Sequence, residues 1–128
     1  MTSIDRNKLK ALREREEKRF VNEHPRSAAW YRGAQGSLLG GVPMNWMKKW
    51  AGAFPVFVAQ AGGAHFTDVD GHEYVDFCLG DTGAMTGHSP KAVADAVARR
   101  VREGITFMLP TEDAVWVGEE LERRFGLP

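Results

Sequence analysis

Alternating and clustered apolar residues predict a small antiparallel β-meander in the middle of the chain. The first strand is expected at residues 57–60, before the break Ala61-Gly62-Gly63, the second at residues 65–69 and the third at residues 73–79. Between the last two strands, Asp70-Gly71 predicts a two-residue hairpin turn with a positive φ at both positions. The third strand leads into a glycine-rich loop and then a helix, an arrangement that can aim backbone amides and side chains at a ligand.

The first part of the chain predicts a mainly polar helix over residues 4–21. It has few large apolar residues, and Leu9, Leu12 and Phe20 share one face as a thin seam. The seam is too narrow to form a core, but it could lie across another subunit. A solvated helix with frayed ends is the alternative interpretation.

Between the polar helix and the first strand, glycines predict an irregular segment that starts near Gly33. Large side chains then follow one another without a clear period: Trp46, Met47, Trp50 and Phe54. We expect these side chains to be buried against a core, a partner chain or the wall of a ligand site.

The last third of the chain predicts two helices. The first is expected to start at Ser89-Pro90, with a hydroxyl N-cap and proline at the first helical position, and to stop before Gly104. The second is expected to start at Thr111 and to be closed by Gly126. The residues expected on their buried faces are Val93, Val97 and Val101 in the first helix and Ala114, Gly118, Leu121 and Phe125 in the second.

These elements predict an α+β fold with an N-terminal helix, a small three-stranded antiparallel sheet and then two helices. We expect three segments: a charged helix and linker at 1–35, a glycine-rich loop and β-meander at 36–89, and two helices at 90–128. The sequence stops at Leu127-Pro128 without a polar tail, so we expect the natural polypeptide to continue.

Composition narrows the classes of function. A chain of 128 residues suits one small domain, and its 17 basic and 17 acidic residues give a formal net charge of zero. This balance argues against a nucleic-acid or polybasic membrane partner. The single cysteine, Cys78, excludes an internal disulfide and favours a reducing compartment. The charged N-terminal region does not resemble a secretory signal and no apolar run is long enough to span a bilayer, so we expect a cytoplasmic location.

Four histidines are candidates for chemistry, but their spacing does not fit a zinc site. His65 is expected to be a surface or hydrogen-bonded strand residue, and His72, beside the hairpin turn, is expected to be solvated. His88 precedes the predicted helix start, and we expect it to fix the loop by hydrogen bonding rather than to act as a ligand.

The remaining polar groups also lack a catalytic arrangement. Cys78 has no paired thiol and is expected to be a small buried hydrophobe. The Gly80-Asp81-Thr82-Gly83 loop fits neither a P-loop nor a dinucleotide fingerprint. Asp68, Asp70 and Asp76 are expected to serve turns and strand edges rather than a metal. The residues by themselves indicate no catalytic, cofactor or metal site.

Two motifs resemble a known family. TDVDGHEYVDF, followed after a glycine loop by GHSPKAVADAV, resembles the N-terminal segment of class III aminotransferases, which are PLP-dependent enzymes of fold-type I. The closer resemblance is to the glutamate-1-semialdehyde aminomutase group. It covers residues 36–125.

The resemblance implies that this chain is part of the small domain and that the α/β large domain is missing. In the family, the pyridoxal 5'-phosphate cup, the aspartate at the pyridine nitrogen and the Schiff-base lysine come later in the chain. Lys48, Lys49 and Lys91 are therefore not assigned to the lysine role. Isolated activity is not expected, and catalytic and cofactor-binding residues are expected outside this chain.

The resemblance places part of this segment on the substrate side of the pocket. The family's carboxylate-binding arginine corresponds here to Met47 or Lys48, depending on where a gap is placed. An aromatic or histidine position in the glycine loop is held by Asp81, followed by Thr82. A carboxylate there suits a hydroxyl, amide or cationic group. Alternatively, Asp81 caps its own loop.

The implied function is transfer of an amino group between an amino acid or amine and a keto acid or aldehyde, by an enzyme that works as a homodimer. The partners would be small molecules, with no nucleic acid and no membrane. Two alternatives are a non-catalytic dimerisation module derived from such an enzyme and a small-ligand-binding domain that uses the loop at residues 80–87.

Overall fold

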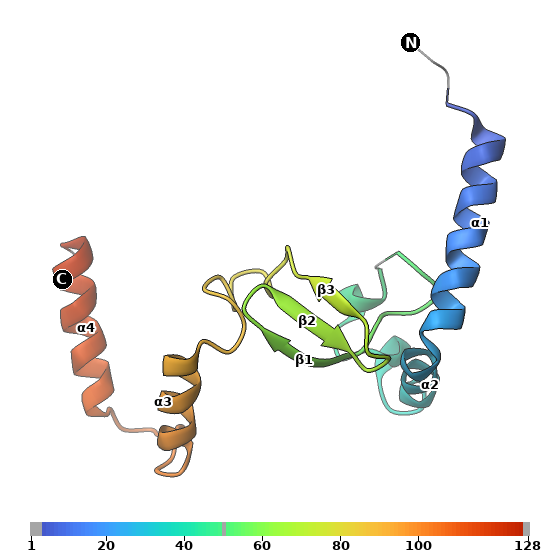
Figure 1. Ribbon diagram of the computed structural model, residues 1–128. Coiled ribbons are helices and arrows are strands. Elements are labelled where there is room, and N and C mark those ends of the chain that lie inside the picture. Colours follow the sequence, from blue (N-terminus) through green and yellow to red (C-terminus); the bar gives the residue numbers. More distant parts are fainter. Residues whose placement is uncertain (1–3, 50, 127–128) are drawn as a thin grey trace. The chain divides into compact units, whose positions relative to one another are not determined.

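The computed structural model of the chain describes residues 4–49 and 51–126. These residues form two compact units, the first ending at Pro90 and the second beginning at Lys91 (Figure 1). Trp50 and Leu127-Pro128, which carried expectations above, lie outside the described residues. Within the described ranges, no helix is both long enough and apolar enough to cross a membrane.

The first unit contains the expected three-stranded antiparallel sheet. Its strands are β1 (Val58–Gly62), β2 (His65–Asp68) and β3 (Glu73–Val75), in the order β1-β2-β3. Gly62 pairs with His65 across the first hairpin, and Thr67 pairs with Glu73 across the second. The α+β class predicted from the sequence is confirmed.

Details of the strands differ from the prediction. β1 continues through Ala61 and Gly62, which were expected to break it, and only residues 63–64 connect it to β2. β3 ends at Val75 instead of residue 79, because the chain turns at Asp76, whose carboxylate accepts the amides of Cys78 and Leu79.

The second hairpin turn is also longer than predicted. The Asp68 amide donates to the His72 carbonyl at 3.0 Å, so residues 69–71 form a three-residue turn. Gly71 has a φ of 96°, whereas Asp70 is not among the residues with positive φ. A three-residue hairpin needs a left-handed residue at only one position, and glycine occupies it here.

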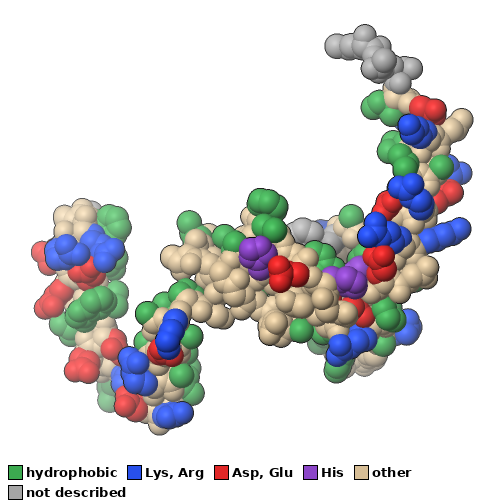
Figure 2. Space-filling model, viewed as in Figure 1, with side chains coloured by type: hydrophobic (Ala, Val, Ile, Leu, Met, Phe, Trp, Pro, Cys, Tyr) green, Lys and Arg blue, Asp and Glu red, His purple; other side chains and the backbone are tan. Residues whose placement is uncertain are grey.

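Two helices precede the sheet. α1 (Arg6–Glu23) is capped by Asp5, whose carboxylate accepts the Asn7 and Lys8 amides at 3.0 Å. Basic and acidic side chains interleave along it (Figure 2), and none of its residues is buried. α2 (Pro25–Ala34) was not predicted, although Pro25 stands at a first helical position.

Most of the buried side chains of the first unit lie where α1 and α2 meet the β2–β3 hairpin. The buried residues described in this unit are few, and half of them are polar: His24, Ser27, Ala28, Gly41, Val42 and Asp68. The irregular segment contains two short 3-10 helices, η1 (Leu39–Gly41) and η2 (Asn45–Lys49). Of its aromatics, Phe54 packs against Phe20 with ring centroids 5.0 Å apart.

The second unit consists of α3 (Lys91–Val101) and α4 (Glu112–Phe125). α3 begins after Pro90, and Ser89 has a left-handed φ of 50° that does not suit the predicted N-cap. Gly104 and Gly126 have the positive φ expected of helix stops, at 98° and 64°.

The predicted buried faces of α3 and α4 are not buried within this unit. Val97 is 52% exposed and Leu121 is 51% exposed, and neither helix contains a buried residue in its described part. Two helices joined by an Arg100–Asp113 ion pair at 3.2 Å cannot cover both apolar faces by themselves.

Candidate functional site

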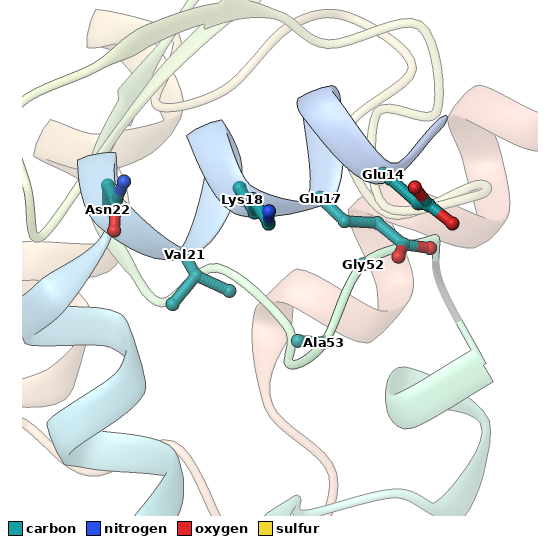
Figure 3. A pocket seen from close by; sticks show the side chains of 7 residues that line it. All are labelled: Glu14, Glu17, Lys18, Val21, Asn22, Gly52 and Ala53. Carbon is teal, nitrogen blue, oxygen red and sulfur yellow. The ribbon is translucent and has the colours of Figure 1, made fainter. Parts of the chain in front are cut away.

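A shallow groove lies between α1 and the segment before the sheet (Figure 3). Its lining includes Glu14, Glu17, Lys18 and Val21 from α1 and Gly52 and Ala53 from the opposite segment. Glu17 is already paired with Arg13 at 2.7 Å. The groove contains none of the residues expected to bind substrate, so it is not our candidate site.

The β2–β3 hairpin and the α1–α2 junction share a partly buried polar cluster, here called the hairpin–helix cluster: His24, Asp68, Asp70, His72 and Tyr74. The Tyr74 hydroxyl lies 2.8 Å from His24 Nε2 and donates to Asp68 Oδ2 at 2.9 Å. His24 Nδ1 lies 2.6 Å from the Phe20 carbonyl oxygen, which can only accept, so this nitrogen carries a proton. His72 Nδ1 lies 3.2 Å from the same Asp68 oxygen.

The cluster corrects one expectation and confirms another. His72 was expected to be solvated, but its side chain is only 38% exposed and bonds to Asp68. Asp68 and Asp70 serve turns as expected: Asp68 Oδ1 accepts the amides of Asp70 and His72 at 2.9 Å. Asp70 accepts the Arg26 and Ser27 amides at 2.7 and 2.9 Å, at the N-terminus of α2.

Electrostatics in the cluster follow from burial and hydrogen bonding. Burial opposes the charge of Asp68, but bonds from the His72 amide and the Tyr74 hydroxyl outweigh it and lower its pKa. Burial and the Asp68 carboxylate raise the pKa of Tyr74, so its hydroxyl keeps its proton at neutral pH. Asp70 has a lowered pKa because the Ser27 and Arg26 amides outweigh its burial.

Three side chains of the cluster have the donor types of a metal site. His24, Asp68 and His72 each offer one ligand atom, and these three atoms lie within 4.8 Å of one another. The Tyr74 hydroxyl, however, is within hydrogen-bonding distance of two of these atoms. The third, His72 Nδ1, bonds to the second. The hydrogen bonds of this group therefore connect the β2–β3 hairpin to the helices.

A second polar constellation closes the glycine loop. Asp76 Oδ2 lies 2.7 Å from His88 Nε2, and Asp76 Oδ1 accepts the Cys78 and Leu79 amides at 2.9 Å. The loop-fixing role expected of His88 is confirmed. The His88 bond, followed by that of the Leu79 amide, lowers the pKa of Asp76.

Inside this loop, Asp81 and Thr82 are both exposed. Asp81 has a left-handed φ of 59°, and the Cys78 thiol lies 3.6 Å from its carboxylate. Among the described residues no backbone amide bonds to the Asp81 side chain, and the capping role falls to Asp76. Cys78 is exposed, so the expectation that it is buried was wrong; the early end of β3 places it in the loop.

The other two expected substrate residues lie on η2. Met47 is half-buried and Lys48 is exposed, with its side chain against Gly40. No hydrogen bond or ion pair links η2 to the glycine loop within residues 4–49 and 51–126. The structure thus places the four expected residues in two separate pairs of one unit.

The exposure of the lysine side chains bears on where a lysine-bound cofactor could sit. A neutral, reactive lysine needs a desolvated site or a cationic neighbour. All six lysines of the chain are exposed, and Lys91 is paired with Asp95 at 2.8 Å.

Sequence reasoning missed the roles of His24 and Tyr74 and the contact between Asp76 and His88. His24 and Tyr74 are 50 residues apart, so no local spacing could join them. The turn role expected of Asp76 was met, because its carboxylate accepts the amides two and three residues later.

No family model matches the chain. A glutamate-1-semialdehyde 2,1-aminomutase from Polaromonas naphthalenivorans is 40% identical over 99 residues, which are 75% of this chain and 22% of that protein. The solved glutamate-1-semialdehyde aminomutase from Pseudomonas aeruginosa PAO1, in complex with PMP, is 54% identical with a TM-score of 0.90. That match covers 99% of this chain and 28% of the solved chain.

A third match, an omega-transaminase from Sphaerobacter thermophilus, is 31% identical with a TM-score of 0.69 and covers 77% of this chain and 22% of that chain. All three matches agree with the resemblance carried by the hairpin and helix-start motifs. The chain spans less than a third of each relative. By sequence and by fold, this chain is homologous to a segment of the glutamate-1-semialdehyde aminomutases and related class III transaminases.

Proposed function

We propose that this chain is the N-terminal portion of a PLP-dependent enzyme that moves an amino group between an amino acid or amine and a keto acid or aldehyde. The observation that carries the proposal is the 54% identity over 99% of the chain to an aminomutase in complex with PMP. Because the chain spans 28% of that protein, the activity belongs to the complete polypeptide.

The cofactor would be held by residues outside this chain, because the resemblance places the phosphate cup and the Schiff-base lysine later in the polypeptide and the chain spans only 28% of the aminomutase that it matches. When bound, it would supply the electron sink for proton transfer at the carbon that carries the amino group. This chain would contribute pocket shape and substrate selection.

The proposed substrate residues are Met47, Lys48, Asp81 and Thr82. Asp81 is an exposed carboxylate without an ion-pair partner among the described residues, so it is available to a cationic, hydroxyl or amide group of a substrate. Lys48 would supply a point charge for a carboxylate, without the bidentate geometry of an arginine. Met47 would supply an apolar wall.

We further propose a homodimer in the cytoplasm that acts on small molecules, without a nucleic-acid or membrane partner. The exposed side chains of α1 support a role in subunit contact, since Leu9 is 56% exposed on a helix without buried residues. The balanced charge supports small-molecule substrates over a polyanion.

The test uses the complete polypeptide, purified with PLP and mixed with a panel of amino donors. We expect donor-dependent loss of the bound cofactor's absorption and its recovery when a keto acid or aldehyde is added. The Asp81→Ala variant should change the ranking of donors, with His65→Ala as the matched control on an exposed strand residue. A colourless protein indifferent to PLP would contradict the proposal and favour a non-catalytic module.

A further inference from the structure

The loop between β3 and α3 contains unusual backbone strain. Leu79, Asp81 and Ser89 have φ values of 49°, 59° and 50°, and they are the only non-glycine residues with positive φ in the described part of the chain. Left-handed backbone is unfavourable for residues with a Cβ atom and persists only where the surroundings enforce it. Such residues concentrate at functional sites.

Asp76 and His88 contact each other from the two ends of this loop. Their side chains meet at 2.7 Å, and the second Asp76 oxygen holds the amides of Cys78 and Leu79 at 2.9 Å. All three bonds involve one carboxylate, whose lowered pKa keeps it ionised at neutral pH.

The backbone of the same two residues ties the loop to the β1–β2 connection. His88 exchanges two backbone hydrogen bonds with Gly63, at 2.9 and 2.8 Å, and the Asp76 amide donates to the Ala64 carbonyl at 2.8 Å. A Cβ atom at Gly87 would lie 3.2 Å from the Gly63 Cα, so the two segments are in close contact. Both ends of the loop are thus hydrogen-bonded to the β1–β2 connection.

We propose that Asp76 and His88 are positioning residues that hold Asp81 and Thr82 in the orientation that selects the substrate. This inference rests on the proposed function, because it gives the loop a substrate to face. Neither residue needs to touch the substrate. Displacement of a binding group by a change in its support can cost roughly tenfold to a hundredfold in binding or rate.

The central experiment is a kinetic comparison in the complete, PLP-loaded polypeptide. His88→Leu removes the N–H that faces Asp76, whereas His88→Gln places an amide nitrogen near the Nε2 position and keeps a donor. We expect His88→Leu to raise KM for the amino substrate by roughly tenfold or more with kcat unchanged. His88→Gln should restore most of the loss, and His65→Ala should behave as the wild type.

A double-mutant cycle separates positioning from general destabilisation. If His88 acts through Asp81, His88→Leu should have little further effect on KM in an Asp81→Ala background. An equal rise of KM in both backgrounds, or an unchanged KM in His88→Leu, would overturn the proposal. A parallel loss of kcat that tracks only the melting temperature would overturn it as well.

Amide hydrogen exchange provides a readout without substrate. The amides of Cys78 and Leu79 should exchange faster in Asp76→Ala and His88→Leu than in the wild type, with exchange in β2 unchanged. Unchanged exchange at these two amides would overturn the positioning role of Asp76 and His88, even if the enzyme shows no activity. Faster exchange in a protein indifferent to PLP would instead contradict the proposed function alone.

Discussion

The Asp70 carboxylate accepts the Ser27 amide at 2.9 Å and thereby caps a helix that lies 43 residues earlier in the chain. α2 has no cap of its own, because the side chain of His24 makes no capping hydrogen bond. The turn of the β2–β3 hairpin supplies the missing acceptor, and its negative charge suits the positive end of the helix. One residue therefore holds the helix start and the sheet together.

Asp70→Ala should destabilise the first unit by about 1 kcal/mol, the usual effect of removing an N-cap side chain. Faster amide exchange at Arg26 and Ser27 should accompany a lower melting temperature of the complete polypeptide. Glu73→Ala, an exposed strand residue, is the control. If the Arg26 and Ser27 amides exchange as in the wild type, Asp70 is not the cap.

Acid should weaken the hydrogen bonds of the hairpin–helix cluster. The pKa values of Asp68 and Asp70 are lowered in the folded protein, so their stabilising contribution is complete above the unfolded value near 3.8 and is lost as the pH falls through the lower folded values. Melting temperatures measured between pH 7 and pH 2 should fall steeply below about pH 4. In Asp70→Asn the melting temperature should fall less steeply over this acidic range. A pH dependence identical to that of the wild type would contradict the assignment.

Tyr74→Phe isolates the hydroxyl at the centre of the hairpin–helix cluster. The ring stacks on Phe66 with centroids 4.8 Å apart, and phenylalanine keeps that contact. Loss of the hydroxyl removes the hydrogen-bonding partner that His24 Nε2 and Asp68 Oδ2 have in common. We expect this to lower the free energy of unfolding by about 1–3 kcal/mol. Chemical denaturation measures this loss, and a variant as stable as the wild type would show that the hydroxyl is dispensable.

Two glycines with similar φ should respond differently to alanine. Gly71 has a φ of 96° and open space around a built Cβ atom, so Gly71→Ala should cost roughly 1 kcal/mol from backbone strain alone. Gly87 has a φ of 93°, and its Cβ would also crowd Gly63 at 3.2 Å. Gly87→Ala should therefore have the lower melting temperature of the two, and the reverse order would contradict the close packing at Gly87.

The sequence contained enough local information to predict the sheet, both stops at Gly104 and Gly126, and the role of His88. It did not predict α2, because that helix starts at a cap supplied by Asp70 from the hairpin. It did not place His24, whose partners Asp68 and Tyr74 are distant in sequence. The apolar faces of α3 and α4 follow the helical period, but period alone does not say what covers them.

The most direct test of the account treats the complete, PLP-loaded polypeptide with borohydride and maps the labelled lysine by peptide mass spectrometry. We expect the yellow colour to be bleached and the label to be on a lysine outside residues 1–128, since the family resemblance places the Schiff-base lysine later in the polypeptide. A label on any of those six lysines, or a protein that takes up no cofactor, would contradict the claim that this segment shapes a pocket whose reacting groups lie elsewhere.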